Sequence, residues 1–90
     1  MEFTLEDQKR MRWHSRRGML ELDLILVPFA EHKLADLSDM QLGWYRDLLS
    51  QEDQDLFGWF IRRDEAPSGD LRAIIDLILL SRSESAVAHD

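Results

Sequence analysis

The nine residues that decide the fold are MLELDLILV, at positions 19–27. Leu20, Leu22 and Leu24 are separated by acidic residues, which is the pattern of a half-buried β-strand. A single strand needs partners, however, and no other segment of this sequence has strand patterning. We therefore predict that this stretch is helical and that the protein is all-α.

On either side of this stretch, the sequence marks where helices begin and end. Thr4 is a suitable N-cap for a helix over residues 5–17, and Gly18 is a natural stop. The second helix then begins at Gly18 and runs into Pro28. Because proline cannot donate to the carbonyl four residues earlier, it should kink or restart this helix before the helix ends near Leu34.

The third helix has the clearest local signals. Ser38 and Gln41 form a capping box, and Leu37 and Leu42 occupy the two positions of a hydrophobic staple. These signals predict a helix that begins directly after Ser38.

Two further helices complete the predicted fold. Asp53 caps a fourth helix, the loop 64–69 ends it, and a fifth helix occupies residues 70–82. Residues 83–90 are expected to form a frayed, flexible polar tail. The prediction is a compact bundle of five short helices that forms a single domain over residues 1–82.

Composition restricts the classes of function. The chain has 90 residues, a net charge of -7 and no cysteine, which fits one domain and excludes disulfides, a thiol nucleophile and the common structural zinc sites. Its longest apolar run, residues 24–30, is far shorter than the roughly 20 residues of a membrane-spanning helix. The N-terminus carries acids where a targeting peptide carries bases. We expect a cytoplasmic protein with no membrane insertion.

Charge is distributed unevenly along the chain. Residues 1–17 hold five basic and three acidic side chains, whereas residues 18–90 hold six basic and fifteen acidic ones. One interpretation is a basic helix beside an acidic body, each simply solvated. The other is a surface that steers a partner toward the first helix.

The sequence shows no evident catalytic constellation. His14, His32 and His89 lie far apart and none stands in an H-E-x-x-H pattern, so we expect no metal site. The glycines form no phosphate-binding loop and the serines form no nucleophile elbow. A helical bundle of this size also has little room for a large pocket. We predict a protein that is not an enzyme and has no catalytic residues.

The aromatic residues divide into two groups. Trp44, Tyr45 and Trp59 have apolar neighbours at helical spacing, so we expect them in the core. Trp13 lies among arginines with few apolar neighbours. An aromatic ring beside arginines is typical of interfaces, so Trp13 is a candidate contact residue.

Two interpretations fit the segment RGMLE, residues 17–21. In the structural one, Arg17 offsets the dipole at the end of the first helix, and Glu21 reaches back to the Gly18 N–H. In the functional one, Gly18 lets a partner backbone approach closely, while Arg17 and Glu21 offer it a donor and an acceptor. The residues alone favour neither interpretation, and both can hold.

A series of short motifs, in order and at matching spacing over about residues 9–80, resembles the small succinate dehydrogenase assembly factors, also called flavinator proteins. The matching residues are Trp13-His14-x-Arg16-Arg17-Gly18-Met19-x-Glu21-Leu22-Asp23, Pro28-Phe29, Glu31-His32, Leu37-Ser38-Asp39 and Asp53-x-Asp55-Leu56-Phe57-x-Trp59. The R-G-x-x-E core alone would be weak evidence, whereas the order of motifs over most of the chain is specific.

The resemblance implies a five-helix bundle that assists covalent attachment of FAD to the flavoprotein subunit of succinate dehydrogenase and, in some bacteria, of fumarate reductase. It places the family's R-G-x-x-E motif on Arg17, Gly18 and Glu21. The residues that it implies for the client-binding surface are Trp13, His14, Arg16, Arg17, Gly18, Glu21 and Asp23.

A second family motif, D-x-x-L-F-x-W, falls on Asp53, Leu56, Phe57 and Trp59, where packing accounts for the apolar members. Gln54 departs from several relatives, which have proline at this position. Mitochondrial members carry a targeting extension, and its absence here implies a bacterial protein.

The resemblance also implies that the chain holds no cofactor of its own and acts on the attachment of FAD to its client. We expect a free monomer that binds no nucleic acid, because a net charge of -7 repels phosphate. The alternative is another interaction module, such as the antitoxin of a toxin–antitoxin pair, or less favourably a small helical nucleic-acid binder.

Overall fold

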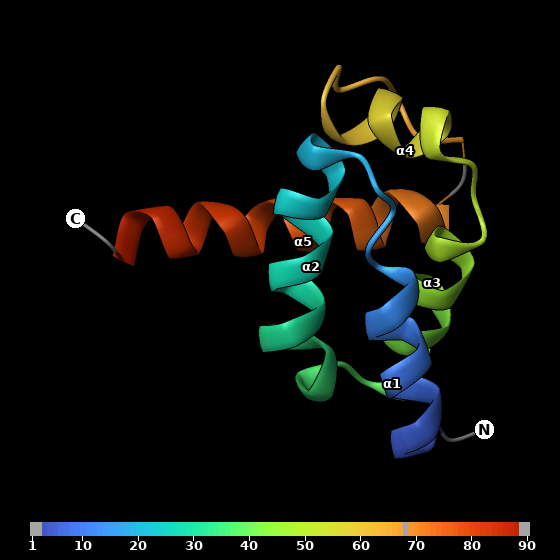
Figure 1. Cartoon of the computed structure of the whole chain (residues 1–90). Helices are drawn as coiled ribbons and strands as arrows, with labels where there is room; N and C mark the ends of the chain where they lie inside the picture. The colour runs from blue at the N-terminus through green and yellow to red at the C-terminus, as the bar shows by residue number, and fades with distance from the viewer. Residues whose placement is uncertain (1–2, 68, 89–90) are drawn as a thin grey trace.

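The computed structural model describes residues 3–67 and 69–88, with side chains as far as Arg82. This part of the chain contains five α-helices and one 3₁₀ turn and has no β-strand (Figure 1). The predicted all-α class is therefore confirmed, as is the helical assignment of the stretch that follows Met19. The elements are α1 (Leu5–His14), α2 (Leu20–Lys33), η1 (Leu34–Asp36), α3 (Asp39–Leu49), α4 (Asp53–Phe60) and α5 (Gly69–Ala88).

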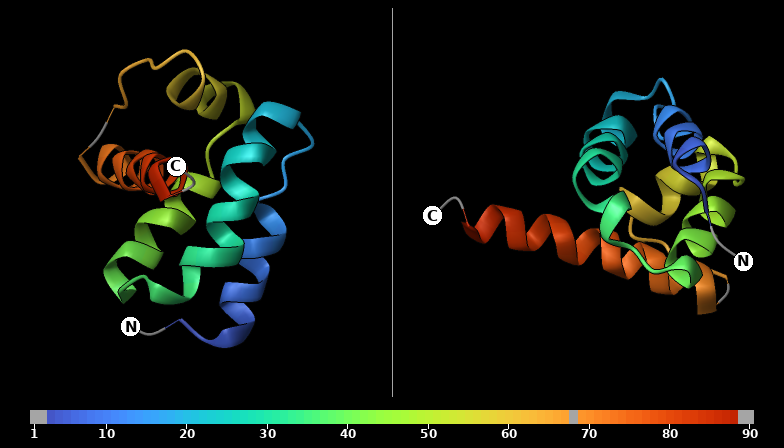
Figure 2. Two further views of the ribbon diagram at one scale, coloured as in Figure 1. Left: turned by 90° about the vertical axis from the view of Figure 1, so that its left-hand side faces the viewer. Right: turned by 90° about the horizontal axis from the view of Figure 1, so that it is seen from below.

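Three helices form an up-down-up arrangement, and two others cross it. In Figure 1, α1 and α3 run in one direction and α2 runs in the opposite one. Helix α4 lies across the end where α1 meets α2, and α5 crosses behind, packing chiefly against α3 and α2. Figure 2 shows that the C-terminal part of α5 extends past α2, away from the other helices. The α1–α2 loop is consequently held beside the loop that joins α3 to α4.

The core draws side chains from every helix. Helical spacing places the apolar residues of each helix on one face, and burial of these faces against one another drives the packing. Tyr45 and Phe60 are the largest of the fully buried side chains. Others are Leu22, Leu26, Leu34, Leu48, Leu56, Ile74 and Ile78.

Two helix starts agree with the local signals in the sequence. Thr4 caps α1, where its hydroxyl accepts from Asp7 N–H at 3.1 Å and the Asp7 carboxylate accepts from Thr4 N–H at 3.0 Å. These hydrogen bonds lower the pKa of Asp7, because they favour its charged form. Ser38 and Gln41 form the predicted capping box at the start of α3.

Helix α2 continues through Pro28 as one α-helix to Lys33, so the helix does not restart at the proline and ends next to the predicted Leu34. Proline leaves the carbonyl of Leu24 without its usual partner in the helix. Arg82 of α5 donates to this carbonyl at 3.3 Å. A neighbouring helix thus replaces the hydrogen bond that proline removes.

Several helix boundaries differ from the prediction, among them the start of α2, which is Leu20 rather than Gly18. Helix α1 ends at His14 rather than at residue 17, and the N-cap of α4 is Glu52 rather than Asp53. Both differences come from the polar contacts of the α1–α2 loop described below. Helix α5 continues to Ala88, where a frayed tail was expected after residue 82, since no glycine or proline interrupts it. His89 lies outside the described residues.

Candidate functional site

The α1–α2 loop, residues 15–19, is organised around the inward-facing side chain of Arg17. Its Nε donates to Asp53 Oδ1 at 2.8 Å, and its Nη2 donates to the carbonyl of Gln51 at 2.9 Å. Its Nη1 donates to the carbonyls of Leu49 at 2.9 Å and His14 at 3.2 Å. The planar guanidinium can serve these four acceptors at once because its donors point in several directions. Arg17 therefore ties the α1–α2 loop to the α3–α4 loop.

A second anchor comes from Asp23 in the first turn and a half of α2. Its carboxylate accepts from the backbone N–H of Arg17 at 2.7 Å and from that of Gly18 at 3.3 Å. The structural interpretation of residues 17–21 assigned the contact with the Gly18 N–H to Glu21, on the expectation that α2 begins at Gly18. Because the helix begins at Leu20 with Met19 as N-cap, Asp23 makes these contacts and Glu21 is left exposed.

Gly18 occupies the left-handed region of backbone conformation, with φ of +85°. A Cβ at this position would meet no atom within 4 Å, so the glycine is needed here for its backbone angle and not to avoid a clash. The turn that it makes lets the chain bring Arg17 inward and then enter α2.

A buried pair of hydroxyl groups lies beneath this loop. The Ser15 hydroxyl donates to the carbonyl of Met11 at 2.8 Å, and the Ser15 and Tyr45 hydroxyl oxygens are 2.6 Å apart. Since Ser15 has one hydroxyl proton and donates it to Met11, Tyr45 is the donor in the pair. Burial raises the pKa of Tyr45 to about 12, against the opposing effect of the positive charge of Arg17. Neutral Tyr45 thus supports the first residue of the loop from the core.

Neither the burial of Ser15 nor the polar role of Tyr45 was predicted from the sequence. Ser15 is fully buried although both of its sequence neighbours are exposed. A tyrosine expected in the core was a usable signal, because a buried phenol needs a hydrogen-bond partner. Nothing in the spacing showed that this partner would be a residue of α1's C-terminus.

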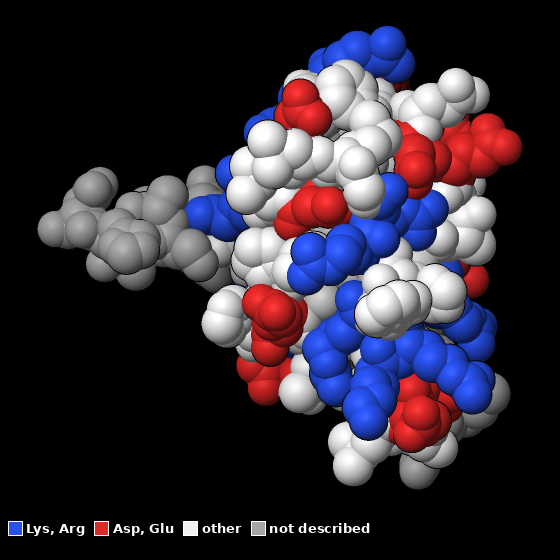
Figure 3. Space-filling view, viewed as in Figure 1, with Lys and Arg blue, Asp and Glu red and all other residues white. Residues whose placement is uncertain are grey.

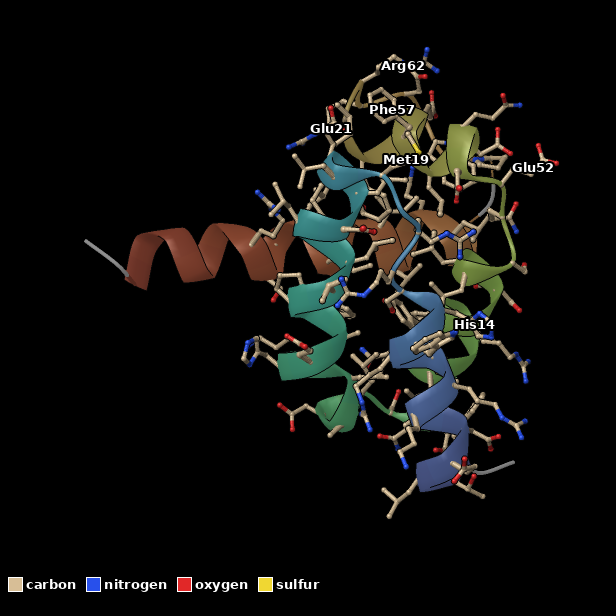
Figure 4. The ribbon with its side chains drawn as sticks, in the orientation of Figure 1. His14, Met19, Glu21, Glu52, Phe57 and Arg62 are labelled. Carbon is tan, nitrogen blue, oxygen red and sulfur yellow. The ribbon has the colours of Figure 1, made fainter. Side chains whose placement is uncertain are left out.

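The seven residues predicted for a partner-binding surface thus have two kinds of environment. Arg17 and Asp23 are partly buried and hold the loop, with 15% of the Arg17 side chain exposed. His14 lies at the end of α1 and Glu21 near the start of α2, on either side of the loop (Figure 4). The exposed residues are Trp13, His14, Arg16, Gly18 and Glu21.

Comparison with known proteins identifies the family. The family model described as "Flavinator of succinate dehydrogenase" matches residues 9–81. The chain belongs to this family.

Its curated relatives share both sequence and description. The FAD assembly factor SdhE of Pseudomonas aeruginosa is 51% identical over 71 residues, which cover 79% of this chain and 84% of the relative. That of Pseudomonas syringae pv. tomato is 50% identical over 70 residues, covering 78% and 83%. That of Idiomarina loihiensis is 38% identical over 78 residues, covering 87% of each. These descriptions give no support to the antitoxin or nucleic-acid alternatives.

In this flavinator, two family motifs are joined by a side-chain contact. Arg17 begins the R-G-x-x-E motif and Asp53 begins the D-x-x-L-F-x-W motif, 36 residues later, and the two are paired at 2.8 Å. Because Asp53 is used by Arg17, Glu52 becomes the N-cap of α4 and makes no side-chain cap bond. Gln54 is exposed as the second residue of α4, outside this contact.

The side chains of Met19, at the end of the loop, and of Phe57, in α4, lie where the loop faces α4 (Figure 4). Both are half-buried and pack against the core cluster. They make an apolar border for the surface on the side of Glu21.

The described residues contain no group of three or more His, Cys, Asp or Glu side chains that could hold a metal ion. None of their helices is long and apolar enough to cross a membrane.

Proposed function

We propose that this flavinator promotes the covalent attachment of FAD to the flavoprotein subunit of succinate dehydrogenase by binding that subunit. The main support is the α1–α2 loop, where hydrogen bonds from within hold Arg17 and the backbone of Gly18 while Trp13, His14, Arg16 and Glu21 remain exposed. The family and the name of its relatives, FAD assembly factor, supply the client and the cofactor.

The seven candidate residues have different roles in binding the client. Trp13, His14, Arg16 and Glu21 contact the client, and Gly18 permits its close approach. Arg17 and Asp23 act as positioning residues, because their polar groups are already used within the protein. Fixing the loop before binding reduces the entropy lost on association.

Binding assists a reaction whose groups belong to the client. The flavin and a client histidine supply the bond-forming chemistry, and this chain acts as a non-catalytic assembly factor that holds no cofactor itself. It binds more tightly to the incompletely closed client in which histidine and flavin are aligned. Such differential affinity raises the population of that state.

The test is covalent flavin fluorescence of the client on a denaturing gel. Glu21→Ala removes an exposed acceptor of the proposed surface, and we expect it to reduce flavinylation at least several-fold with an unchanged melting temperature. Glu52→Ala is the matched control, because Glu52 is also exposed and makes no side-chain cap bond. Full flavinylation with Glu21→Ala would show that Glu21 is not part of the client-binding surface. Normal flavinylation of the client in the absence of this protein would contradict the proposed function.

The remaining features of the proposal concern partners and location. The flavoprotein subunit of fumarate reductase is a second client, the free protein is a cytoplasmic monomer, and it binds no nucleic acid. Pull-downs with each purified subunit and sedimentation of the free protein check these statements. A stable dimer in sedimentation would contradict the monomer.

A further inference from the structure

A groove beside the loop has a charge opposite to that of the whole chain. It lies between α1 and α2 and has a volume of about 570 Å³. Figure 3 shows basic side chains gathered over α1 and the loop. We call it the basic groove, and its lining includes Lys9, Arg10, Arg12, Trp13, Arg16 and Val27.

The four bases of the basic groove form no ion pair within the described part of the protein. Ion pairs there involve Arg17, Arg62 and Arg72 instead. Two acids, Glu6 and Glu31, also line the groove and leave it with an excess of positive charge. Four bases held close together repel one another, so an anionic partner would gain from binding here.

Trp13 provides the apolar part of this surface. It is 78% exposed, although indole burial is a large source of binding energy. Tryptophan and arginine are the residue types that most often dominate protein interfaces, where a ring of polar contacts excludes water around them. Trp13 beside Arg12 and Arg16 therefore fits a partner that presents carboxylates around an apolar side chain.

Shape and charge favour a protein segment over a membrane or nucleic acid. The basic groove is concave, whereas a membrane surface is flat. Glu6 and Glu31, which also line the groove, would face the phosphates of a bound lipid or nucleic acid. The net charge of -7 would also repel an extended polyanion. A short acidic segment contacts the groove without meeting the acidic remainder of the chain.

We propose that the basic groove binds an acidic segment of the client flavoprotein subunit, with Trp13 packed on an apolar residue of that segment. This proposal rests on the proposed function, since Trp13 and Arg16 also belong to the client-binding surface. The groove extends that surface from the α1–α2 loop along α1.

The experiment compares two double variants with the same change in total charge. Lys9→Glu/Arg12→Glu reverses two bases of the groove. Lys33→Glu/Arg63→Glu reverses two bases outside it that form no ion pair among the described residues. Circular dichroism and melting curves first establish that both variants fold as the parent does. Association with the purified flavoprotein subunit is then measured at low and high salt.

We expect the groove variant to associate at least about tenfold more slowly than the parent at about 50 mM salt. The difference should shrink to about twofold at about 500 mM salt, because salt screens exposed charges. The control variant should retain most of the parental rate. An equal loss in both variants, or a loss in neither, would overturn the groove while leaving the proposed function intact. Failure of the parent to bind the subunit would instead remove the proposed function.

A second measurement identifies the occupant. A photo-crosslinking phenylalanine analogue replaces Glu31, whose loss removes a negative charge from the groove. The crosslinked client peptide should be acidic and contain an apolar residue. A neutral or basic peptide would overturn the proposal. So would binding of anionic lipid vesicles by the parent that Lys9→Glu/Arg12→Glu abolishes without affecting client association.

Discussion

The α1–α2 and α4–α5 loops each contain an arginine that pairs with a carboxylate, but these pairs have different surroundings. Arg17 in the first loop is 15% exposed and also donates to three backbone carbonyls. In and beside the second loop, Arg62 pairs with Asp64 at 3.0 Å, and all the paired side chains are at least half exposed. Arg72 and Glu65 form the other pair, at 2.6 Å.

The difference shows when an ion pair determines a conformation. The two side chains of an exposed pair give up contacts with water in order to contact each other, and they lose conformational entropy. Their net effect on the free energy of unfolding is therefore small. Arg17 satisfies backbone carbonyls that would otherwise lose their partners near the protein interior. The same kind of ion pair therefore fixes the conformation of the α1–α2 loop but contributes little to that of the α4–α5 loop.

Of the substitutions that test this comparison, the removal of Arg17 should lower the free energy of unfolding most. Arg17→Ala leaves Asp53 and the carbonyls of Leu49 and Gln51 without their donor, and we expect it to lower the free energy of unfolding by about 2 to 4 kcal/mol. Urea denaturation measures the change. Arg17→Lys keeps one charge but cannot reach all the acceptors, so an intermediate loss is expected. The neighbouring, exposed Arg16→Ala should change stability by less than about 0.5 kcal/mol. Equal effects of the two alanine variants would contradict the anchoring role of Arg17.

The support beneath the first loop should appear as a pH dependence. Tyr45 ionises near pH 10 in the unfolded chain, but burial raises its pKa to about 12 in the folded protein. The folded state binds this proton more tightly, so its contribution is complete below pH 10 and is lost as the pH rises toward 12. The expected loss of unfolding free energy is on the order of 2 kcal/mol.

Denaturation at a series of alkaline pH values measures this loss, and Tyr45→Phe is its control. The variant loses its hydrogen bond to Ser15 at every pH but should lack the additional slope between pH 10 and 12. An identical slope in the parent and the variant would assign the alkaline loss to other groups.

A matched pair of glycine substitutions tests the backbone of the first loop. Gly18→Ala places a Cβ on a residue with φ of +85°, which should cost about 1 kcal/mol. Gly43→Ala, in the middle of α3, also meets no atom within 4 Å and should stabilise the protein by about 0.5 to 1 kcal/mol. Thermal melting should therefore show shifts of opposite sign. Shifts of the same sign would indicate that the loop tolerates the additional Cβ.

The features that the sequence predicted correctly depend on short separations along the chain. The N-cap at Thr4 and the capping box at Ser38 and Gln41 join residues at most three positions apart, and such spacing is visible in the sequence. The all-α class followed from the absence of a second strand pattern. The motif region was located by the resemblance, and the exposed positions of Trp13 and Glu21 are compatible with the predicted surface.

The environment of Arg17 could not be predicted because three of its four acceptors lie 32 to 36 residues away. Two of them are backbone carbonyls, which any residue type provides, so Leu49 and Gln51 carry no signal in the sequence. The end of α1 at His14 follows from the same contacts. Helix propensity alone favours three more helical residues, but the inward turn to Arg17 requires the helix to stop earlier.

The smallest effect should come from the exposed pairs of the α4–α5 region. Arg72→Ala removes the partner of Glu65, yet both groups remain hydrated, so the free energy of unfolding should fall by less than about 1 kcal/mol. Any loss should shrink further in high salt, where exposed charges are screened. Urea denaturation at low and high salt measures both effects. A loss as large as that of Arg17→Ala would mean that exposure does not separate the two kinds of pair. A small, salt-sensitive loss would leave the backbone carbonyls around Arg17 as the reason that one loop is fixed.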